Sequence, residues 1–282
     1  DAQIGEEHSF SLEAQAAEIP VVAPLALREA LMPHPAGVHI EPVAAAPDTL
    51  ARYAGEAGEW RFAIWPRRAG RPAELEDLDV LERLGACLGR LHAVGAARPF
   101  LHRHRLDLVA DTRHALDELR EAQALPPDQA PGWEAIGRQV LERLQADTAR
   151  LPTTALRLHG DCHPGNLLWR DGPNLVDLDD ACTGPAVQDL WMLLSGEPGA
   201  ARQQLAALLE GYERFRPFDR RELGLVDALR LSRMVRHNAW VARRWADPAF
   251  PRAYPDFGSS AYWAQQTLAL REQLFSAGDA DA

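Results

Sequence analysis

The sequence contains no lysine, so all 30 of its basic residues are arginines. Cysteines are few as well: Cys87, Cys162 and Cys182 are scattered and form no CxxC pair, which argues against a disulfide framework or a zinc site and fits a reducing cytosol. We see no signal-peptide pattern and no apolar run of about 18 residues, the length that predicts a transmembrane helix. We therefore expect a cytoplasmic protein with no membrane partner.

Basic residues are also fewer than acidic residues. Aspartate and glutamate number 41 against 30 arginines, and the formal net charge is −11. Since nucleic-acid affinity comes mostly from basic residues that neutralise phosphates, this balance argues against nucleic acid as the main partner. One small basic loop, residues 102–105, is expected to be solvated surface. With 282 residues, 46% of them hydrophobic, the chain has the composition of an ordinary globular protein, which we expect to be monomeric.

Residues 156–182 concentrate acidic, amide and imidazole side chains between apolar runs. An Asp-Gly pair between two apolar runs is the strongest short-range signal for a β-hairpin. If Asp171 and Gly172 form a two-residue loop, Asn166 pairs directly with Asp177. Opposed residues on antiparallel strands have Cβ atoms ~4.5–5.5 Å apart, so this amide and carboxylate converge as oxygen ligands of Mg²⁺ do. A one-residue slip of the register would destroy the pairing.

A third polar side chain, Asp161, comes from a loop ahead of the hairpin. Pro164-Gly165 rules out a continuous helix or strand between this residue and the hairpin. A kinase-like phosphotransferase needs a base for the acceptor hydroxyl and two metal ligands for the nucleotide phosphates. We assign Asp161 the first role, and Asn166 and Asp177 the second. Asp179 alternates onto the strand face of Asp177, which makes it a second metal ligand or an orienting group.

These residues carry a resemblance to known proteins. His159-Gly-Asp-x-x-x-x-Asn166 followed by Val176-Asp-Leu-Asp-Asp180 resembles the phosphotransferase motif of the aminoglycoside phosphotransferase and choline kinase superfamily, which shares the protein kinase fold. The longer strings LRLHGDCHPGNLLWRDGP, VDLDDA, GPAVQDLWMLL and RRWADPAFP resemble the bacterial stress response kinase A family, which phosphorylates protein serine and threonine. The similarity runs from about Ala2 to about Leu268.

The resemblance implies an α+β fold of the protein kinase type, with a truncated N-terminal lobe and hinge in residues 1–66 and a large α-helical C-terminal lobe, carrying the catalytic hairpin, in residues 67–282. It also implies an ATP- and Mg²⁺-dependent serine/threonine protein kinase. Such a site normally uses a glycine-rich loop and a strand lysine on the phosphates, and this sequence has neither. We therefore expect the first strands of the N-terminal lobe to precede Asp1, and the 282 residues to fold without acting as a kinase.

Helical periodicity recurs along the chain. The resemblance implies that the first helix supplies the carboxylate that pairs with the strand lysine; we choose Glu7 and keep Glu6 as the alternative. A second segment has leucines at spacings of three and four from Leu75 to Leu91, typical of a helix buried on one face. The predicted helices span residues 2–18, 72–94, 111–123, 132–150, 186–194, 201–215, 222–247 and 261–275.

Three further roles follow from the resemblance. Residues 60–66 alternate as a strand and end in proline, and they become the hinge, where main-chain groups around Ile64 and Trp65 hold adenine. Asp189 is similar to the buried aspartate that anchors the backbone of the catalytic loop. His159 is expected to support that loop by packing and hydrogen bonding rather than to act as a base.

The sequence is compatible with three other functions. Phosphoryl transfer to a small alcohol, such as an aminoglycoside, choline or a homoserine-like compound, would use the same residues. A metal-dependent hydrolase is a second alternative, because imidazoles and carboxylates bind transition metals; its ligands would be His159, Asp161, His163, Asp177 and Asp179. A non-catalytic pseudokinase would explain the missing lysine, although the base and both metal ligands are intact.

Overall fold

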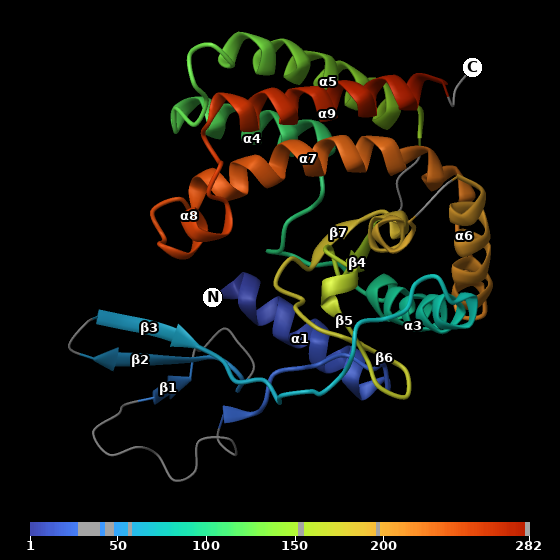
Figure 1. Ribbon diagram of the computed structural model, residues 1–282. Helices are drawn as coiled ribbons and strands as arrows, with labels where there is room; N and C mark the ends of the chain where they lie inside the picture. Colours follow the sequence, from blue (N-terminus) through green and yellow to red (C-terminus); the bar gives the residue numbers. More distant parts are fainter. Residues whose placement is uncertain (28–39, 43–47, 56–57, 152–154, 196–197, 280–282) are drawn as a thin grey trace. The chain divides into compact units, whose positions relative to one another are not determined.

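The structure is a computed structural model that describes residues 1–27, 40–42, 48–55, 58–151, 155–195 and 198–279 (Figure 1). By packing, the chain divides into two units: one contains residues 1–105 and 154–219, the other residues 106–153 and 220–282. Small antiparallel sheets and long helices make up the described residues, and the predicted α+β class is confirmed. The predicted lobe boundary after residue 66 stays a prediction.

The first unit begins with helix α1, Ala2–Ala16. Phe10 of this helix is completely buried. Arg157, in strand β4 (Leu156–Leu158), lies with its guanidinium 4.7 Å from the centre of the Phe10 ring, and so attaches the helix to this strand. The helix ends earlier than the predicted residue 18, because the chain has left the helical conformation at Glu18, where φ is 57°.

A three-stranded antiparallel sheet follows in the order β1-β2-β3, with bounds Ile40–Pro42, Ala51–Gly55 and Gly58–Phe62. The predicted strand over residues 60–66 is therefore wrong beyond the end of β3. From there the chain pairs elsewhere, since the N–H of Leu25 donates to the carbonyl oxygen of Ile64 at 2.8 Å. Trp60 and Trp65 are 57% and 46% exposed, so the alternating pattern of apolar residues does not indicate a buried face of a strand here.

Helix α3, Leu78–Ala96, begins later than the predicted residue 72. Asp77 sets its start, because the Asp77 side chain accepts the N–H of Asp79 at 2.9 Å and caps the first turn. Leu78 lies in that first turn and is 43% exposed. The predicted stripe is buried from the second turn onward, at Leu81, Leu84, Leu88 and Leu91.

α3 packs closely against helix α6, Pro198–Glu213. A Cβ atom at Gly85 of α3 would lie 1.8 Å from the carbonyl oxygen of Leu208, so the two backbones approach each other where no larger residue fits. The predicted helix over residues 201–215 is confirmed, with both ends shifted toward the N-terminus.

Two short antiparallel sheets complete the first unit: β4 pairs with β7 (Cys182–Gly184), and β5 (Leu167–Trp169) pairs with β6 (Pro173–Leu175). The predicted helical segment over residues 186–194 is split into two 3-10 helices, η2 at Ala186–Asp189 and η3 at Trp191–Leu193. The side chains of Gln188 and Asp189 bond the loop at residues 159–160, and these tertiary contacts override the local apolar pattern.

Among the described residues of the second unit the α-helices are α4, α5, α7, α8 and α9, at Leu108–Glu121, Ala130–Arg150, Val226–Arg243, Ala249–Ala253 and Ser260–Asp279 (Figure 1). α4 packs against α5 and α7, and α9 packs against α5 and α7. The predicted helices over residues 111–123, 132–150 and 261–275 are confirmed. The predicted helix over residues 222–247 is split, since the 3-10 helix η4, Arg220–Leu225, precedes α7.

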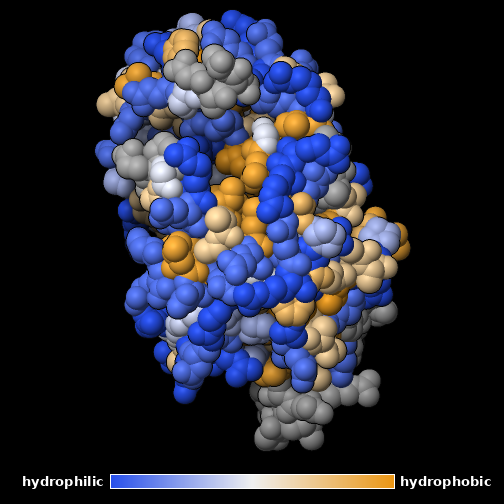
Figure 2. Space-filling model, turned by 90° about the vertical axis from the view of Figure 1, so that its right-hand side faces the viewer, coloured by the Kyte–Doolittle hydropathy of each residue, from blue (hydrophilic) through white to orange (hydrophobic). Residues whose placement is uncertain are grey.

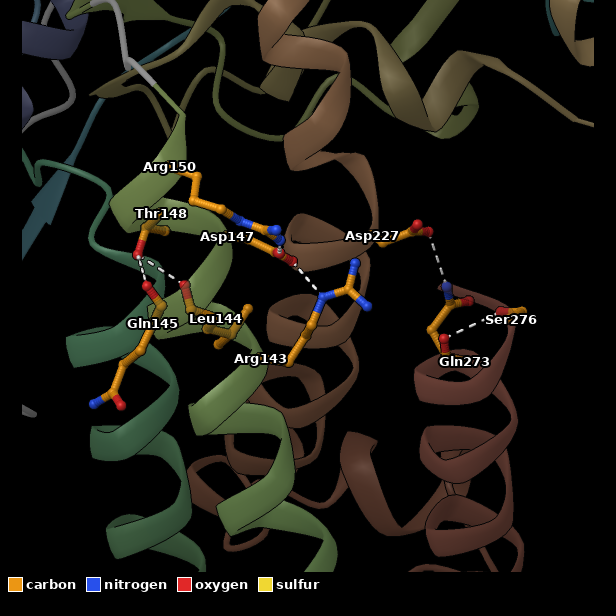
Figure 3. A network of polar contacts seen from close by, with 9 residues as sticks. All are labelled: Arg143, Leu144, Gln145, Asp147, Thr148, Arg150, Asp227, Gln273 and Ser276. Atoms are coloured by element: carbon orange, nitrogen blue, oxygen red, sulfur yellow. Dashed lines mark hydrogen bonds and ion pairs between the residues drawn. The ribbon is translucent and has the colours of Figure 1, made fainter. Parts of the chain in front are cut away.

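Polar contacts form within and between these helices (Figure 3). Asp147 of α5 is buried, and its carboxylate accepts from Arg143 at 2.7 Å and from Arg150 at 2.9 Å. A buried charge is tolerated when it is paired in this way. Gln273 of α9 donates to Asp227 of α7 at 3.1 Å, which fixes the position of one helix along the other.

Hydrophilic residues cover most of the face shown in Figure 2. Among the described residues, no helix has both the length and the apolar character needed to cross a membrane. Cys87, Cys162 and Cys182 are all buried and unpaired, in agreement with the predicted absence of a disulfide framework.

Candidate active site

The predicted hairpin forms, but its register differs by one residue. β5 and β6 pair Leu168 with Asn174 and Trp169 with Pro173, so the loop contains residues 170–172 rather than Asp171 and Gly172 alone. Proline explains the shift. A two-residue loop would be closed by mutual hydrogen bonds between residues 170 and 173, and Pro173 has no N–H to give.

The predicted pairing of Asn166 with Asp177 is therefore wrong. The carbonyl oxygen of Asn166 accepts the N–H of Val176 at 3.1 Å, and Asp177 lies beyond that bond. The φ of Asp177 is 64°, so the chain turns there, and Asp177 and Asp179 do not alternate along a strand as predicted. Their carboxyl groups nevertheless share a hydrogen bond, so a turn brings together what a strand was expected to align.

A buried aspartate fixes the loop that carries Asp161. Asp189 is completely buried, and its carboxylate accepts the backbone N–H of His159 and of Gly160, each at 2.8 Å. Nε2 of His92 donates to the same carboxylate at 3.0 Å. Burial raises the pKa of Asp189, but the hydrogen bond and charge of His92 outweigh it, and the pKa lies below its usual value. These contacts confirm the anchoring role that the resemblance implied.

His159 supports the loop as predicted. It is completely buried, its Nε2 donates to the carbonyl oxygen of Val176 at 2.9 Å, and its Nδ1 is buried as well. A ring placed in this way is not free to bind a metal, which removes a ligand from the hydrolase alternative. Within the ranges that the structure describes, no three His, Cys, Asp or Glu side chains are placed to hold a metal among themselves.

Gly160 permits the closest approach in this loop, because its φ is 87° and a Cβ there would lie 2.0 Å from the carbonyl oxygen of Asp180. We predict that Gly160→Ala lowers the free energy of unfolding by about 2–5 kcal/mol, which combines left-handed strain with overpacking. Urea denaturation measures this loss. Gly258→Ala is the matched control, since Gly258 has the same φ of 87° and no atom within 4 Å of a Cβ. Equal losses in the two variants would contradict the contact with Asp180.

Asp161 and Asn166 are joined through the loop backbone. The side-chain N–H of Asn166 donates to the carbonyl oxygen of Asp161 at 3.0 Å, and its Oδ1 has no hydrogen bond within the described part of the chain. The Asp161 side chain is 18% exposed, with Nε2 of His163 3.5 Å from its carboxylate. A partly exposed carboxylate suits a base, and an amide oxygen with no bond among the described residues suits a metal ligand; the roles of Asp161 and Asn166 stay predictions.

Two adjacent glutamates of α1 have different surroundings. Glu6 accepts the N–H groups of residues 101–103 at 2.6 to 2.8 Å. Glu7 is 9% exposed, and burial raises its pKa, with the negative charges of Asp177 and Asp180 adding to the effect. Of the two candidates for the helix carboxylate, Glu7 therefore faces the aspartates and Glu6 holds a loop.

Arg103 was expected in a solvated basic loop, and this expectation is wrong. Its side chain is 11% exposed and lies 3.3 Å from the carboxylate of Glu7. Its guanidinium also donates to the carbonyl oxygens of Ala181, at 2.7 Å, and of Asp179. One cation thus ties helix α1 to the segment that carries the aspartates. Local sequence contains no signal that separates Arg103 from Arg105, so the pattern could not identify it.

The carboxyl groups of Glu7, Asp177, Asp179 and Asp180 act on one another and are called the carboxylate cluster below. Asp179 is an exposed residue, but partial burial of its carboxyl group, together with the negative charges of Asp180 and Asp177, raises its pKa to about 7. Neighbouring carboxylates favour either a shared proton or a bound cation. Mg²⁺ is typically held by one or two carboxylates together with substrate phosphates and waters, so the cluster and Oδ1 of Asn166 fit this ion without a full protein cage.

The raised pKa of Asp179 makes stability depend on pH. Between the ordinary value of 3.8 and about 7, the folded state holds this proton more tightly than the unfolded state, so the contribution to stability is lost as pH rises. We predict that in EDTA, Asp179→Asn gains stability relative to the wild type from about pH 5 to about pH 8. Urea denaturation at both pH values tests this, and a difference that does not change with pH would contradict it.

The predicted adenine-binding segment is partly engaged by the protein itself. The carbonyl oxygen of Ile64 already accepts the N–H of Leu25. The rings of Trp65 and His8 form a T-shaped pair with the centroids 5.6 Å apart, and burial lowers the pKa of His8 to about 4. The roles of Ile64 and Trp65 at adenine stay predictions.

Comparison with known sequences identifies the family of the chain. The family model described as "Phosphotransferase enzyme family" matches residues 1–226. Stress response kinase A of Escherichia coli strain K12 is 40% identical over 274 residues, which cover 96% of this chain and 76% of the relative. Serine/threonine protein kinase RdoA of Salmonella typhimurium is 40% identical over 271 residues, with the same coverage. The resemblance drawn from the sequence motifs is confirmed.

Comparison with solved structures bears on the fold. Amicoumacin kinase in complex with AMP-PNP, Ca²⁺ and its ligand gives a TM-score of 0.66 at 16% identity, covering 97% of this chain and 77% of that chain. Spectinomycin phosphotransferase in complex with ADP and spectinomycin gives 0.59 at 11% identity, covering 96% and 82%. Both identities are low, so these structures confirm the kinase-like fold and carry no argument about the acceptor.

Proposed function

Because the chain belongs to the phosphotransferase enzyme family, we propose that it is an ATP- and Mg²⁺-dependent kinase whose acceptor is a serine or threonine hydroxyl of a protein. The anchored loop carries the proposal. Asp189 holds the backbone of residues 159 and 160. The loop lies against the segment that carries the aspartates, at the carbonyl oxygen of Asp180 and at the hydrogen bond from the N–H of Val176 to Asn166. The name of a relative, serine/threonine protein kinase, supports a protein acceptor.

Each polar group of the site has a role in this proposal. Asp161 orients the acceptor hydroxyl and takes its proton, because phosphoryl transfer needs chiefly positioning and charge stabilisation from the protein. Oδ1 of Asn166 and the carboxylate of Asp177 hold Mg²⁺, and Asp179 acts as a second ligand or orients Asp177. When bound, Mg²⁺ neutralises charge on the nucleotide phosphates.

Arg103 and Glu7 position this site without touching the acceptor. Their ion pair of 3.3 Å, together with the bond from Arg103 to Ala181, holds α1 against the chain that follows Asp177. In a complete kinase site, Glu7 is the helix carboxylate that pairs with a lysine on the phosphates, in keeping with the resemblance. In this structure its partner is an arginine.

The test is an assay of the full-length protein with γ-labelled ATP and Mg²⁺. A generic protein acceptor is compared with kanamycin, spectinomycin and choline, and the labelled protein is hydrolysed to detect phosphoserine and phosphothreonine. We expect label on protein serine or threonine, lost in EDTA. Transfer to a small alcohol but not to protein would reassign the acceptor. Hydrolysis with Zn²⁺ or Mn²⁺ in the absence of nucleotide would replace the kinase proposal with the hydrolase alternative.

A further inference from the structure

A cavity of about 600 Å³ lies in the second unit, between α4, α5 and their connection. All its lining residues fall within positions 113–141, so none belongs to the loop or the carboxylate cluster of the candidate active site. Its size is that of a site for a small organic molecule, which typically measures ~300–1,000 Å³. The proposed kinase activity makes no use of it.

The inner wall of the cavity is apolar. Leu119 of α4 is completely buried and Trp133 of α5 is 2% exposed, and both line the cavity together with Leu116, Leu125 and Leu141. The Trp133 ring packs against the ring of Trp263, with the ring centroids 4.9 Å apart. An apolar wall of this kind suits an aliphatic or aromatic body, whose transfer out of water is favourable.

Charged side chains surround this wall, and two of them form no ion pair or hydrogen bond with a described residue. Arg120 pairs with Asp117 at 2.8 Å and with Glu134 at 3.7 Å. Arg113 and Arg138 have no ion pair or hydrogen bond with any described residue. Three arginines against two carboxylates leave the lining with one positive charge. Two free guanidinium groups beside an apolar wall match one carboxylate, which arginine binds in a fixed fork geometry.

We propose that this cavity binds a monoanionic organic carboxylate with an apolar body. Arg113 and Arg138 hold the carboxylate, and the leucines and the Trp133 ring cover the body. A neutral compound of the same shape would bind less well, because it leaves both arginines without an anion.

Isothermal titration with 2-naphthoate tests the proposal, with 2-naphthylmethanol as the neutral analogue of matched shape. We expect naphthoate to bind at least ~10-fold more tightly than the alcohol, and the double variant Arg113→Gln/Arg138→Gln to remove that preference. Arg236→Gln, at an exposed position of α7, is the matched control and should bind as the wild type does. No binding at millimolar naphthoate, or an unchanged preference in the double variant, would overturn the proposal.

Discussion

Asp177→Ala is expected to abolish Mg²⁺-dependent nucleotide binding. Asp177 is exposed, carries a carboxylate of the cluster and lies one residue beyond the bond from Val176 to Asn166, so it is the group proposed to reach the metal with Oδ1 of Asn166. Loss of outer-shell partners alone weakens metal binding ~10–100-fold, so loss of a ligand should exceed that range. Titration of the full-length protein with a fluorescent ATP analogue, with Mg²⁺ and with EDTA, measures the effect.

The backbone at Asp177 requires a second variant. Its φ of 64° is tolerated by aspartate and asparagine better than by alanine, so Asp177→Ala also strains the turn. Asp177→Asn keeps the turn and removes the charge, and should lose the Mg²⁺-dependent part of binding as well. Asp171→Asn, at an exposed loop position whose φ is 59°, is the control and should bind normally. A variant of Asp177 that binds Mg·ATP as the wild type does would remove Asp177 from the metal site.

The sequence was informative where the chemistry is local. Asp161 and Asn166 lie in one short loop, and the Asp-Gly pair predicted a hairpin that does form. The predicted register is wrong because Pro173 cannot donate the backbone hydrogen bond that a two-residue loop requires. Asp177 and Asp179 still share a hydrogen bond, although a turn rather than a strand face brings them together.

Contacts between distant segments could not be predicted from pattern. Arg103 lies far along the chain from Glu7 and from Ala181, and its three bonds exist only once α1 and the aspartate segment are folded. The hydrogen bond of His92 to Asp189 could not be predicted either, because the sequence around a histidine near the end of a leucine-rich helix does not indicate its hydrogen-bond partner. The leucine spacing predicted α3, but its start depends on the cap at Asp77.

The other large effect concerns the proposed base. Asp161→Asn in the full-length protein should lower phosphoryl transfer at least ~10²-fold, about 2.7 kcal/mol in transition-state stabilisation, because asparagine keeps the size of the side chain but cannot take the proton of the acceptor. Nucleotide affinity should change little, since this group acts on the acceptor and not on ATP. The loop should stay in place, because its backbone is held by Asp189 rather than by the Asp161 side chain.

Separate measurements distinguish this role from metal binding. Single-turnover transfer to the protein acceptor reports the chemical step, and titration with the fluorescent ATP analogue reports nucleotide affinity on the same sample. Asp171→Asn controls for the loss of one carboxylate at an exposed position and should turn over as the wild type does. If Asp161→Asn loses transfer and Mg·ATP affinity to the same extent, the residue belongs to the metal site; if it loses neither, the proposed base lies elsewhere. A selective loss of transfer leaves Asp161 as the group that receives the acceptor proton.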